Sequence, residues 1–562
     1  MKIRHGNCLK LKPLVTSVLL LGAAACGGSD SNGGTFVPLP SQSPRSSAPA
    51  PESEVVESPE PVASPAPPRT FSARPPIGVQ AVPGTPVAAL PDHSDHANIE
   101  DPSPQPAVSA MTMSEPEAPT YTREWVVSTS GDDAGDGSAA RPLRTINQAI
   151  RLAGPGELIR VLAGTYAERV IIGDNAKPGT ADAKITLQGE GNPRIVLGPG
   201  EHGLVQVRQP HWIIDGFELD LEGQTPFAVT FEGDVTGSML VNSDLHGGTG
   251  GGAVTTFNGA TGPIIENNHI HDFVKTTGNE DSHGVVVQPT SRDVTVRNND
   301  IHDNSGDSVQ CLGPEGFSNL PPAEGLLVEN NHLYGNRENA VDIKTCFDVV
   351  VRNNRMHRFL PTSTAKGEVV VVHYSASNVL VEDNEIYDSA KGISVGGSRD
   401  GALPSGVIVR RNRLHDITDA GGGEGTAIRL ENSEGTLVVN NTVTRAATAL
   451  TLGHGTGGPT QAAVVRNNIF ADAPIAVNLG PMAPGMKMGH NLFPAGAQFK
   501  QEGVAVDLTA FQAATGDTTS RAGAADLGAA FAPGPMAQDS GEDIGMPFCG
   551  AGPDIGAVEL GC

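Results

Sequence analysis

The chain of 562 residues is poor in aromatic side chains, in basic side chains and in long apolar runs. Aromatic residues make up 4% of the chain, which favours a core of aliphatic side chains. Lys and Arg number 37 against 63 Asp and Glu, which argues against nucleic acid as a partner. The apolar run at 14–25 is too short to span a bilayer as a mature helix.

Helical periodicity is also missing from the middle of the chain, where a repeat takes its place. An Asn-Asn pair, or a variant of it, recurs with an apolar residue two positions later, and the pairs are 23 to 32 residues apart. Such a period is typical of a solenoid. The second residues of the pairs are Asn268, Asn299, Asn331, Asn354, Asn384, Asn412, Asn441 and Asn468.

Each repeat contains three short stretches that alternate with a period of two, for example 294–296 before a pair and 340–344 at the end of a repeat. This pattern predicts three strands per coil and three parallel sheets, with a rise of about 4.8 Å per coil. Asn tolerates left-handed backbone angles, and its amide can bond its copy in the next coil. The sequence therefore predicts an all-β fold, a right-handed parallel β-helix of about ten to twelve coils over 123–562.

The first 122 residues predict export rather than a folded domain. Residues 1–26 have four basic residues, the apolar run and then Ala23-Ala24-Ala25-Cys26, a pattern that predicts a lipoprotein-type signal peptide. The small residues before the cysteine resemble the bacterial lipoprotein cleavage box, which implies a lipid on Cys26 and anchoring in the outer membrane. Plain secretion is the alternative. Residues 27–122 are rich in Pro, Ser, Ala and Glu and predict a disordered linker.

Removal of the signal leaves 33 basic and 63 acidic residues, a formal charge of −30. Four cysteines then remain in an exported domain, where oxidation is expected. We expect Cys549 to pair with Cys562 near the end of the chain. Cys311 and Cys346 are expected to pair across adjacent coils, with two stacked free thiols as the alternative.

The third strand of each coil offers a surface for a glycan, because outward positions on successive coils form a flat grid. An alignment by the Asn pairs sets 370–374 beside 340–344 and predicts a substrate-binding role for several outward residues. A run of valines before His373 leaves the register open by one residue, so His373 and Tyr374 are both catalytic candidates. The polar residues predicted on this grid and at its strand entrances are His283, Asp307, Gln288, Gln310, Asp342, Lys344, Tyr374, Arg429 and Glu431.

A second column falls three residues after each Asn pair and contains mostly imidazole and phenol rings. It could be mistaken for a metal ladder, but we interpret it as ring stacking along another sheet. Its members are His271, His302, Tyr334, His357, Tyr387 and His415.

Both ends of the predicted solenoid resemble known exported β-helix proteins. The stretch from Trp125 to Asp133, continuing through Pro142–Ile150 to Thr165-Tyr166, is similar to the N-terminal segment of family 9 pectate lyases. The resemblance implies a strand, a capping helix and the first coil. The segment 553–559 resembles the closing motif of the same broad group.

The central element 338–344 carries a carboxylate, Asp342, and an ammonium, Lys344, on one face. It is partly similar to the Glu-Ile-x-x-Lys element of family 6 alginate and chondroitin lyases. It is also partly similar to the calcium segment of family 9. The first resemblance implies Lys344 as the base, and the second implies a possible calcium ion at Asp307 and Asp342. We expect the Asp342–Lys344 pair to lie on the surface, where it adds little stability.

These observations favour an exported, monomeric polysaccharide lyase that cleaves an acidic, uronate-containing polysaccharide by β-elimination. Such a lyase needs a base, a cation beside the uronate carboxylate and an acid near the leaving oxygen. A non-catalytic glycan-binding or structural surface protein is the first alternative. A glycoside hydrolase or uronate epimerase on the same scaffold is the second, and the hydrolase requires clustered carboxylates.

Overall fold

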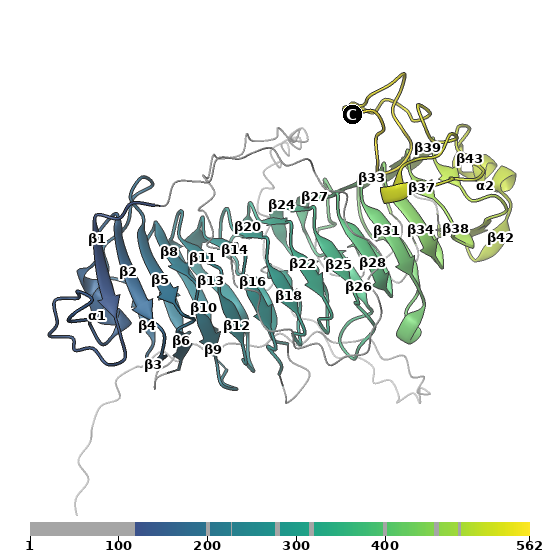
Figure 1. The fold of residues 1–562 in the computed structure, drawn as a ribbon. Coiled ribbons are helices and arrows are strands. Elements are labelled where there is room, and N and C mark those ends of the chain that lie inside the picture. The colour runs from purple at the N-terminus through teal and green to yellow at the C-terminus, as the bar shows by residue number, and fades with distance from the viewer. Residues whose placement is uncertain are drawn as a thin grey trace, which may run out of the picture. The chain divides into compact units, whose positions relative to one another are not determined.

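The computed structural model describes residues 119–197, 203–225, 227–275, 281–313, 320–396, 402–453, 460–481 and 485–562. Their strands stack as a right-handed parallel β-helix, as predicted (Figure 1). The predicted signal peptide, with Cys26, and residues 27–118 of the predicted linker lie outside the described residues.

Three sheets of 15, 14 and 14 strands form the walls of the described solenoid, and neighbouring strands are parallel except β41 (Gln498–Gln501) and β42 (Val504–Val506), which are antiparallel. Sheet I runs from β1 (Arg123–Val127) to β39 (Lys487–Gly489), sheet II from β4 (Val170–Ile172) to β42, and sheet III from β3 (Thr165–Ala167) to β43 (Arg521–Ala522). The core between them is mainly aliphatic, as the scarcity of aromatic residues predicts.

Sheets II and III carry clusters of polar side chains on their outer faces. The relevant strands of sheet II are β16 (His283–Val287), β19 (Val309–Cys311), β23 (Val341–Ile343), β26 (Glu368–Val372), β29 (Lys391–Gly396) and β32 (Thr426–Glu431). Those of sheet III are β9 (Glu218–Asp220), β12 (Asp244–His246), β15 (His269–His271), β18 (Asp300–His302), β22 (His332–Tyr334), β25 (Arg355–His357), β28 (Glu385–Ser389) and β31 (Arg413–Ile417).

The Asn pairs lie at the turns from sheet I into sheet III, and the two members of each pair have different structural roles. The first member adopts a left-handed backbone, with φ 55° at Asn267 and 57° at Asn298 and Asn330. The second member is buried, and its amide Nδ2 donates to Oδ1 of its copy one coil on, at 3.0 Å from Asn268 to Asn299 and from Asn299 to Asn331. The same bonds continue to Asn491, so the predicted ladder is continuous.

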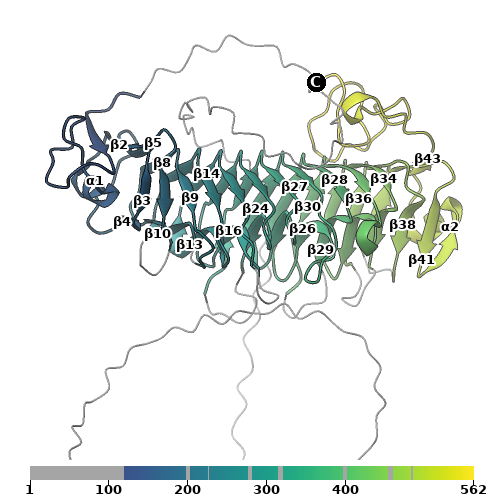
Figure 2. The same cartoon turned by 60° about the horizontal axis from the view of Figure 1, so that its bottom comes forward.

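Short helices close the two ends of the solenoid (Figure 2). At the first coil lies α1 (Ile146–Leu152), whose N-cap Thr145 accepts the N–H of Gln148. At the last coils lies α2 (Leu508–Thr515), which buries Phe511 against Phe499. These helices have seven and eight residues, whereas a bilayer requires about 20. None of the helices in the described ranges therefore spans a membrane.

The four cysteines of the solenoid form two disulfides. Cys311 at the end of β19 pairs with Cys346 at the start of β24 (Cys346–Arg352), and Cys549 pairs with Cys562. These are the pairs that the sequence indicates. The C-terminal tail folds back on sheet III, where Ile555 is buried and Asn440 Nδ2 donates to the carbonyl of Asp554.

Candidate functional site

Sheet II presents most of the predicted site residues, and its register corrects one coil of the alignment. Four residues lie in register on the successive strands β19, β23, β26 and β29: Val309, Val341, Val370 and Ile393. The alignment had set Val370 beside Ala340, which is wrong by one residue. Four successive valines look alike from either face, so only the backbone hydrogen bonds decide the register.

This shift places His373, rather than Tyr374, beside Lys344 on the outer face. The N–H of His373 donates to the carbonyl of Ile343 at 2.9 Å. Tyr374 follows in a left-handed conformation with φ 53°, and its ring lies 4.5 Å from the ring of His373. Of the two catalytic candidates, His373 is the one that contacts the centre of the grid.

Asp342 is that centre, and it contacts side chains from the coils on both sides. Its Oδ1 accepts a hydrogen bond from Nε2 of His373 at 2.7 Å, and its Oδ2 lies 3.9 Å from Nζ of Lys344. Asp342 and Lys344 are each 6% exposed. The expectation of a surface ion pair is therefore wrong, because neighbouring coils cover both groups.

Asp307 lies one coil earlier and is fully buried. Its Oδ1 accepts the N–H of Asn339 at 2.9 Å, and its Oδ2 accepts Nε2 of Gln310 at 2.9 Å. Its own N–H donates to Nδ1 of His283 at 2.9 Å. Gln310 Nε2 also lies 3.5 Å from Oδ2 of Asp342, so one amide bridges the two carboxylates.

His283, Asp307, Gln310, Asp342, Lys344 and His373 thus form one chain of polar contacts across β16, β19, β23 and β26. We call it the Asp342 network. It contains six of the predicted site residues.

Glu338 is the residue that the sequence reasoning missed. Its carboxylate lies within 4.8 Å of the ligand atoms of His283 and Asp307. Burial, with a contribution from Asp307, raises the pKa of Glu338 to about 9. Its position in the central element, directly before Asn339, could have drawn attention to it. Glu338 precedes the strand, however, so the predicted grid of outward strand residues did not include it.

The charge states of the other carboxylates follow from their neighbours. Burial alone would raise the pKa of Asp342, but His373 and Lys344 lower it to about 2. Burial raises the pKa of Asp307, and the negative charge of Asp342 raises it further. A proton-holding acid, Glu338, therefore lies beside Asp307, and the amide of Gln310 links Asp307 to the ionised Asp342.

Arg429 and Glu431 belong to a separate cluster. Arg429 Nη2 bonds Oε2 of Glu431 at 2.8 Å, and Arg429 also pairs with Glu424. In register, Val371 and Ser394 stand between Asp342 and Arg429. The structure therefore does not bring these two predicted substrate-binding residues to the Asp342 network.

The predicted calcium site at Asp307 and Asp342 does not fit the donors found there. Calcium takes six to eight oxygen ligands. Here the carboxylate oxygens accept hydrogen bonds from Asn339, Gln310 and His373, and an ammonium lies nearby. Acidic clusters do occur among the described residues.

The comparisons with known proteins agree on the fold. A family model described as a right-handed beta helix region matches residues 315–470. No curated protein matches the sequence significantly. Likenesses to solved structures concern the fold alone, since sequence identities are low.

Three of these structures illustrate the range of sequence identity, coverage and TM-score. Pectate lyase Pel9A is 16% identical with a TM-score of 0.39, covering 78% of this chain and 97% of its own. A mannuronic acid specific family 6 lyase from human gut microbiota is 12% identical with a TM-score of 0.49, covering 72% and 91%. The family 6 alginate lyase AlyGC is 18% identical with a TM-score of 0.48, and the match spans 67% of this chain and about half, 53%, of that enzyme.

Proposed function

We propose that this β-helix is an exported polysaccharide lyase that cleaves a uronate-containing glycan by β-elimination. The observation that carries the proposal is the trio of His373, Asp342 and Lys344 on sheet II. An imidazole held by a buried carboxylate and an ammonium from the adjacent coil meet at one point.

His373 is the base in this proposal. Asp342 holds its Nε2, and Nδ1 has no hydrogen-bond partner within the described ranges, so Nδ1 is available to take a proton. The His373 side chain is 13% exposed, which leaves an edge for substrate. A base oriented by a buried carboxylate is a common device of proton transfer.

In this proposal Lys344 is given a different role from the one predicted from the sequence. It is an ion-pair partner of Asp342, so we assign it to the negative charge of the uronate rather than to proton removal. When His373 removes the proton from C5, the electron pair moves toward the uronate carboxylate, and a nearby cation stabilises that enolate.

Glu338 supplies the acid. With a pKa of about 9 it holds its proton at neutral pH. As the C4–O bond breaks, the enolate electrons form the C4=C5 double bond and the leaving oxygen takes a proton. Base, cation and acid are then all present on adjacent coils.

The test is a panel of pectate, alginate and glycosaminoglycans, each with and without calcium, followed by the ultraviolet absorbance of the unsaturated uronate. We expect one polymer to give this signal, and His373→Gln to lower turnover by about 10²-fold or more. His357→Gln, on sheet III, is the matched control and keeps full turnover. A full rate for His373→Gln would contradict the assigned base.

A glycoside hydrolase is the second candidate, and the cluster of Asp307, Glu338 and Asp342 favours it. A protonated carboxyl near an ionised one is the usual arrangement for such hydrolysis. The same incubations distinguish the two, because a hydrolase releases reducing ends without the unsaturated product. Binding of a polymer without any cleavage would leave a glycan-binding surface protein.

We also propose export with a lipid anchor at Cys26, on the sequence evidence of a basic start, an apolar run and small residues before the cysteine. Mass spectrometry of the membrane-extracted protein is expected to find a lipid-modified Cys26 at the mature N-terminus. An unmodified Cys26, or cleavage elsewhere, would replace this proposal with plain secretion.

A further inference from the structure

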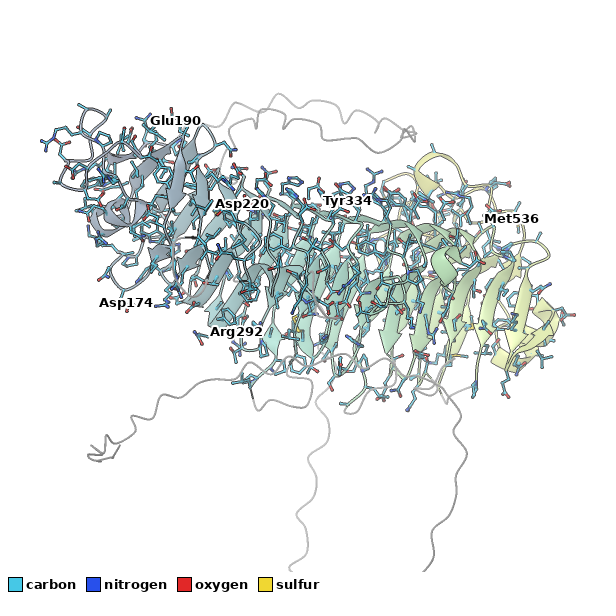
Figure 3. All side chains as sticks on the ribbon, turned by 90° about the horizontal axis from the view of Figure 1, so that it is seen from below. Asp174, Glu190, Asp220, Arg292, Tyr334 and Met536 are labelled. Atoms are coloured by element: carbon cyan, nitrogen blue, oxygen red, sulfur yellow. A yellow bond between two sulfur atoms is a disulfide. The ribbon has the colours of Figure 1, made fainter. Side chains whose placement is uncertain are left out.

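The outer face of sheet III carries two columns of ring and charged side chains. One column stacks rings, with centroids of His271 and His302 at 5.5 Å and of His302 and Tyr334 at 4.6 Å. The stack continues to His357, Tyr387 and His415, which confirms the predicted ring stacking. Asp220 and Tyr334, labelled in Figure 3, lie along this side of the solenoid.

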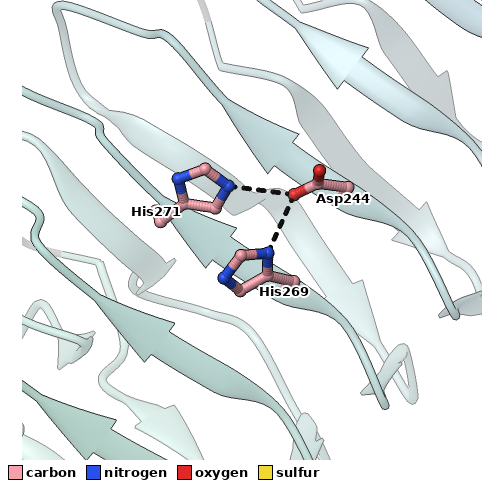
Figure 4. Close-up of side chains that lie close together, drawn as sticks. All are labelled: Asp244, His269 and His271. Atoms are coloured by element: carbon pink, nitrogen blue, oxygen red, sulfur yellow. Dashed lines mark hydrogen bonds and ion pairs between the residues drawn. The ribbon is translucent and has the colours of Figure 1, made fainter. Parts of the chain in front are cut away.

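At β12 and β15 the stacked rings meet a carboxylate. Oδ1 of Asp244 lies 3.2 Å from Nδ1 of His269 and 3.1 Å from Nε2 of His271 (Figure 4). All three ligand atoms lie within 4.8 Å of one another. The two imidazoles come from one strand at positions i and i+2, so both project from the same face.

The tautomer of His271 is set by its other nitrogen. Nδ1 lies 2.8 Å from Oδ2 of Asp272, and a carboxylate only accepts, so Nδ1 carries the proton. In a neutral ring Nε2 would be a lone pair 3.1 Å from Oδ1 of Asp244, which also only accepts, so a second proton on the ring or a cation must lie between the two atoms. A carboxylate that holds the far nitrogen is the usual second partner of a metal-binding histidine.

The tautomer of His269 is set through the next coil. Nδ1 of His302 donates to Oδ2 of Asp303 at 2.8 Å, so Nε2 of His302 is an acceptor. Nε2 of His269, 2.8 Å away, must donate to it. His269 Nδ1 is therefore also a lone pair, and it is buried without a hydrogen-bond partner in the described structure.

With both rings neutral, three lone pairs converge on one point, which is repulsive unless a cation lies at the centre. A proton on His271 or a metal ion bound by all three side chains removes this repulsion, and the spacing of the ligand atoms bears on the second case. Metal–ligand bonds of about 2.0–2.1 Å at tetrahedral angles separate ligand atoms by about 3.3 Å. The separations of 3.1 and 3.2 Å from Asp244 to the two rings are close to that value.

A neighbouring cluster shows the contrast. Glu218, Asp220 and His246 also bring three ligand atoms together. There Arg194 forms ion pairs with both Glu218 and Asp220 and so supplies the positive charge. In the described ranges, by contrast, Asp244 forms its ion pairs with imidazoles only.

We propose that Asp244, His269 and His271 bind a divalent transition-metal ion such as Zn²⁺. Two imidazoles and one carboxylate suit Zn²⁺, Ni²⁺ or Cu²⁺, whereas Ca²⁺ and Mg²⁺ prefer oxygen ligands. The side chains are 18% to 30% exposed, so the ion can enter from solvent and a water can complete its coordination. The ion would join β12 to β15 and is independent of the proposed lyase chemistry.

Calorimetry with ZnCl₂ tests the site, on the untagged mature chain after treatment with a chelator. We expect one tight site per chain, lost or weakened at least tenfold in His271→Ala and in Asp244→Asn. His332→Ala, in the same column as His269, is the matched control and keeps the site. Near-ultraviolet circular dichroism of each variant verifies folding before titration.

The visible spectrum of bound Co²⁺ provides a second measurement, because residues that only stabilise the fold would not produce it. Co²⁺ bound to the mature chain should give the visible spectrum of a four-coordinate N₂O-type site, and Asp244→Asn should abolish it. If the chain takes up no Zn²⁺ or Co²⁺, or if folded Asp244→Asn and His271→Ala both bind as tightly as the parent, the proposal is overturned. The cluster would then be a protonated imidazolium–carboxylate group.

Discussion

At the scale of single residues, burial determines what the charges on sheet II do. Asp342 and Lys344 are both covered by neighbouring coils, and His373 closes the group from the next strand. A buried charge depends on its partners far more than an exposed one, because water no longer compensates for a lost contact. The stability and the chemistry of the Asp342 network are therefore linked.

This linkage gives the first prediction. Lys344→Ala leaves Asp342 with less positive charge in a buried place, so we expect the free energy of unfolding to fall by about 1–3 kcal/mol. Chemical denaturation measures the change. Lys366→Ala, which removes an exposed lysine, is the control and should stay within about 0.5 kcal/mol of the parent. An equally small effect for Lys344→Ala would mean that the Asp342–Lys344 ion pair contributes no more to stability than an exposed pair does.

The second prediction concerns pH. The folded state holds the proton of Glu338 up to a pKa of about 9, whereas the unfolded chain releases it near its ordinary value of 4.5. The contribution to stability is therefore fully present below pH 4.5 and is lost as the pH rises through 9. The melting temperature measured between pH 5 and 9 should fall on this account.

Glu338→Gln removes the titration while keeping the shape of the protonated side chain. We expect a shallower decline of melting temperature with pH and a gain of about 1 kcal/mol or more at pH 8. The exposed Glu502→Gln is the control. If both variants follow the parent curve, Glu338 is ionised in the folded protein and is not the acid of the proposed reaction.

At the scale of elements, the turns between sheets I and III hold the coils in register. The second Asn of each pair bonds forward to its copy, and its amide also donates back to the preceding coil, as Asn331 does to the carbonyl of Val296 at 2.9 Å. Each buried amide therefore links three coils, and the loss of one leaves partners on both sides unsatisfied.

The third prediction follows from this arrangement. Asn331→Ala leaves the Nδ2 group of Asn299 and the carbonyl of Val296 without their partner, so we expect a loss of about 1–3 kcal/mol in the free energy of unfolding. Asn330→Gly is the matched control, because glycine adopts the left-handed angle of that turn without strain. An unchanged denaturation midpoint for Asn331→Ala would mean that the ladder adds no stability.

At the scale of the whole solenoid, the ends matter because every coil but the first and last is covered by its neighbours. Helix α1 buries Ile146, Ala149 and Ile150 over the first coil. An uncovered coil would present unpaired backbone groups from parallel strands, which invite pairing with another molecule.

The fourth prediction tests this cover. Ile150→Glu places a charge at a position that is 1% exposed, so α1 should detach and the open end should associate. Light scattering after size-exclusion chromatography is expected to show larger species for this variant. Arg151→Glu changes the charge at the adjacent exposed position and should elute as the parent does.

The sequence by itself determined the features that repeat. The period, the three strands per coil and the Asn ladder depend on patterns within about 30 residues, and these patterns recur in successive coils. The pairing of Cys311 with Cys346 agrees with the same period, because their separation of 35 residues is about one coil and brings them to adjacent coils. Local pattern and stacking are sufficient for these conclusions.

Only the tertiary structure decided how individual side chains meet. Val369–Val372 presents valine on both faces of the strand, so the sequence does not define which residues point outward. The backbone hydrogen bonds define the register, and they place His373 beside Lys344. The burial of Asp342 and the approach of Glu338 to Asp307 likewise depend on packing between coils. Such contacts join residues that are about 30 positions apart, and no local pattern records their distance or exposure.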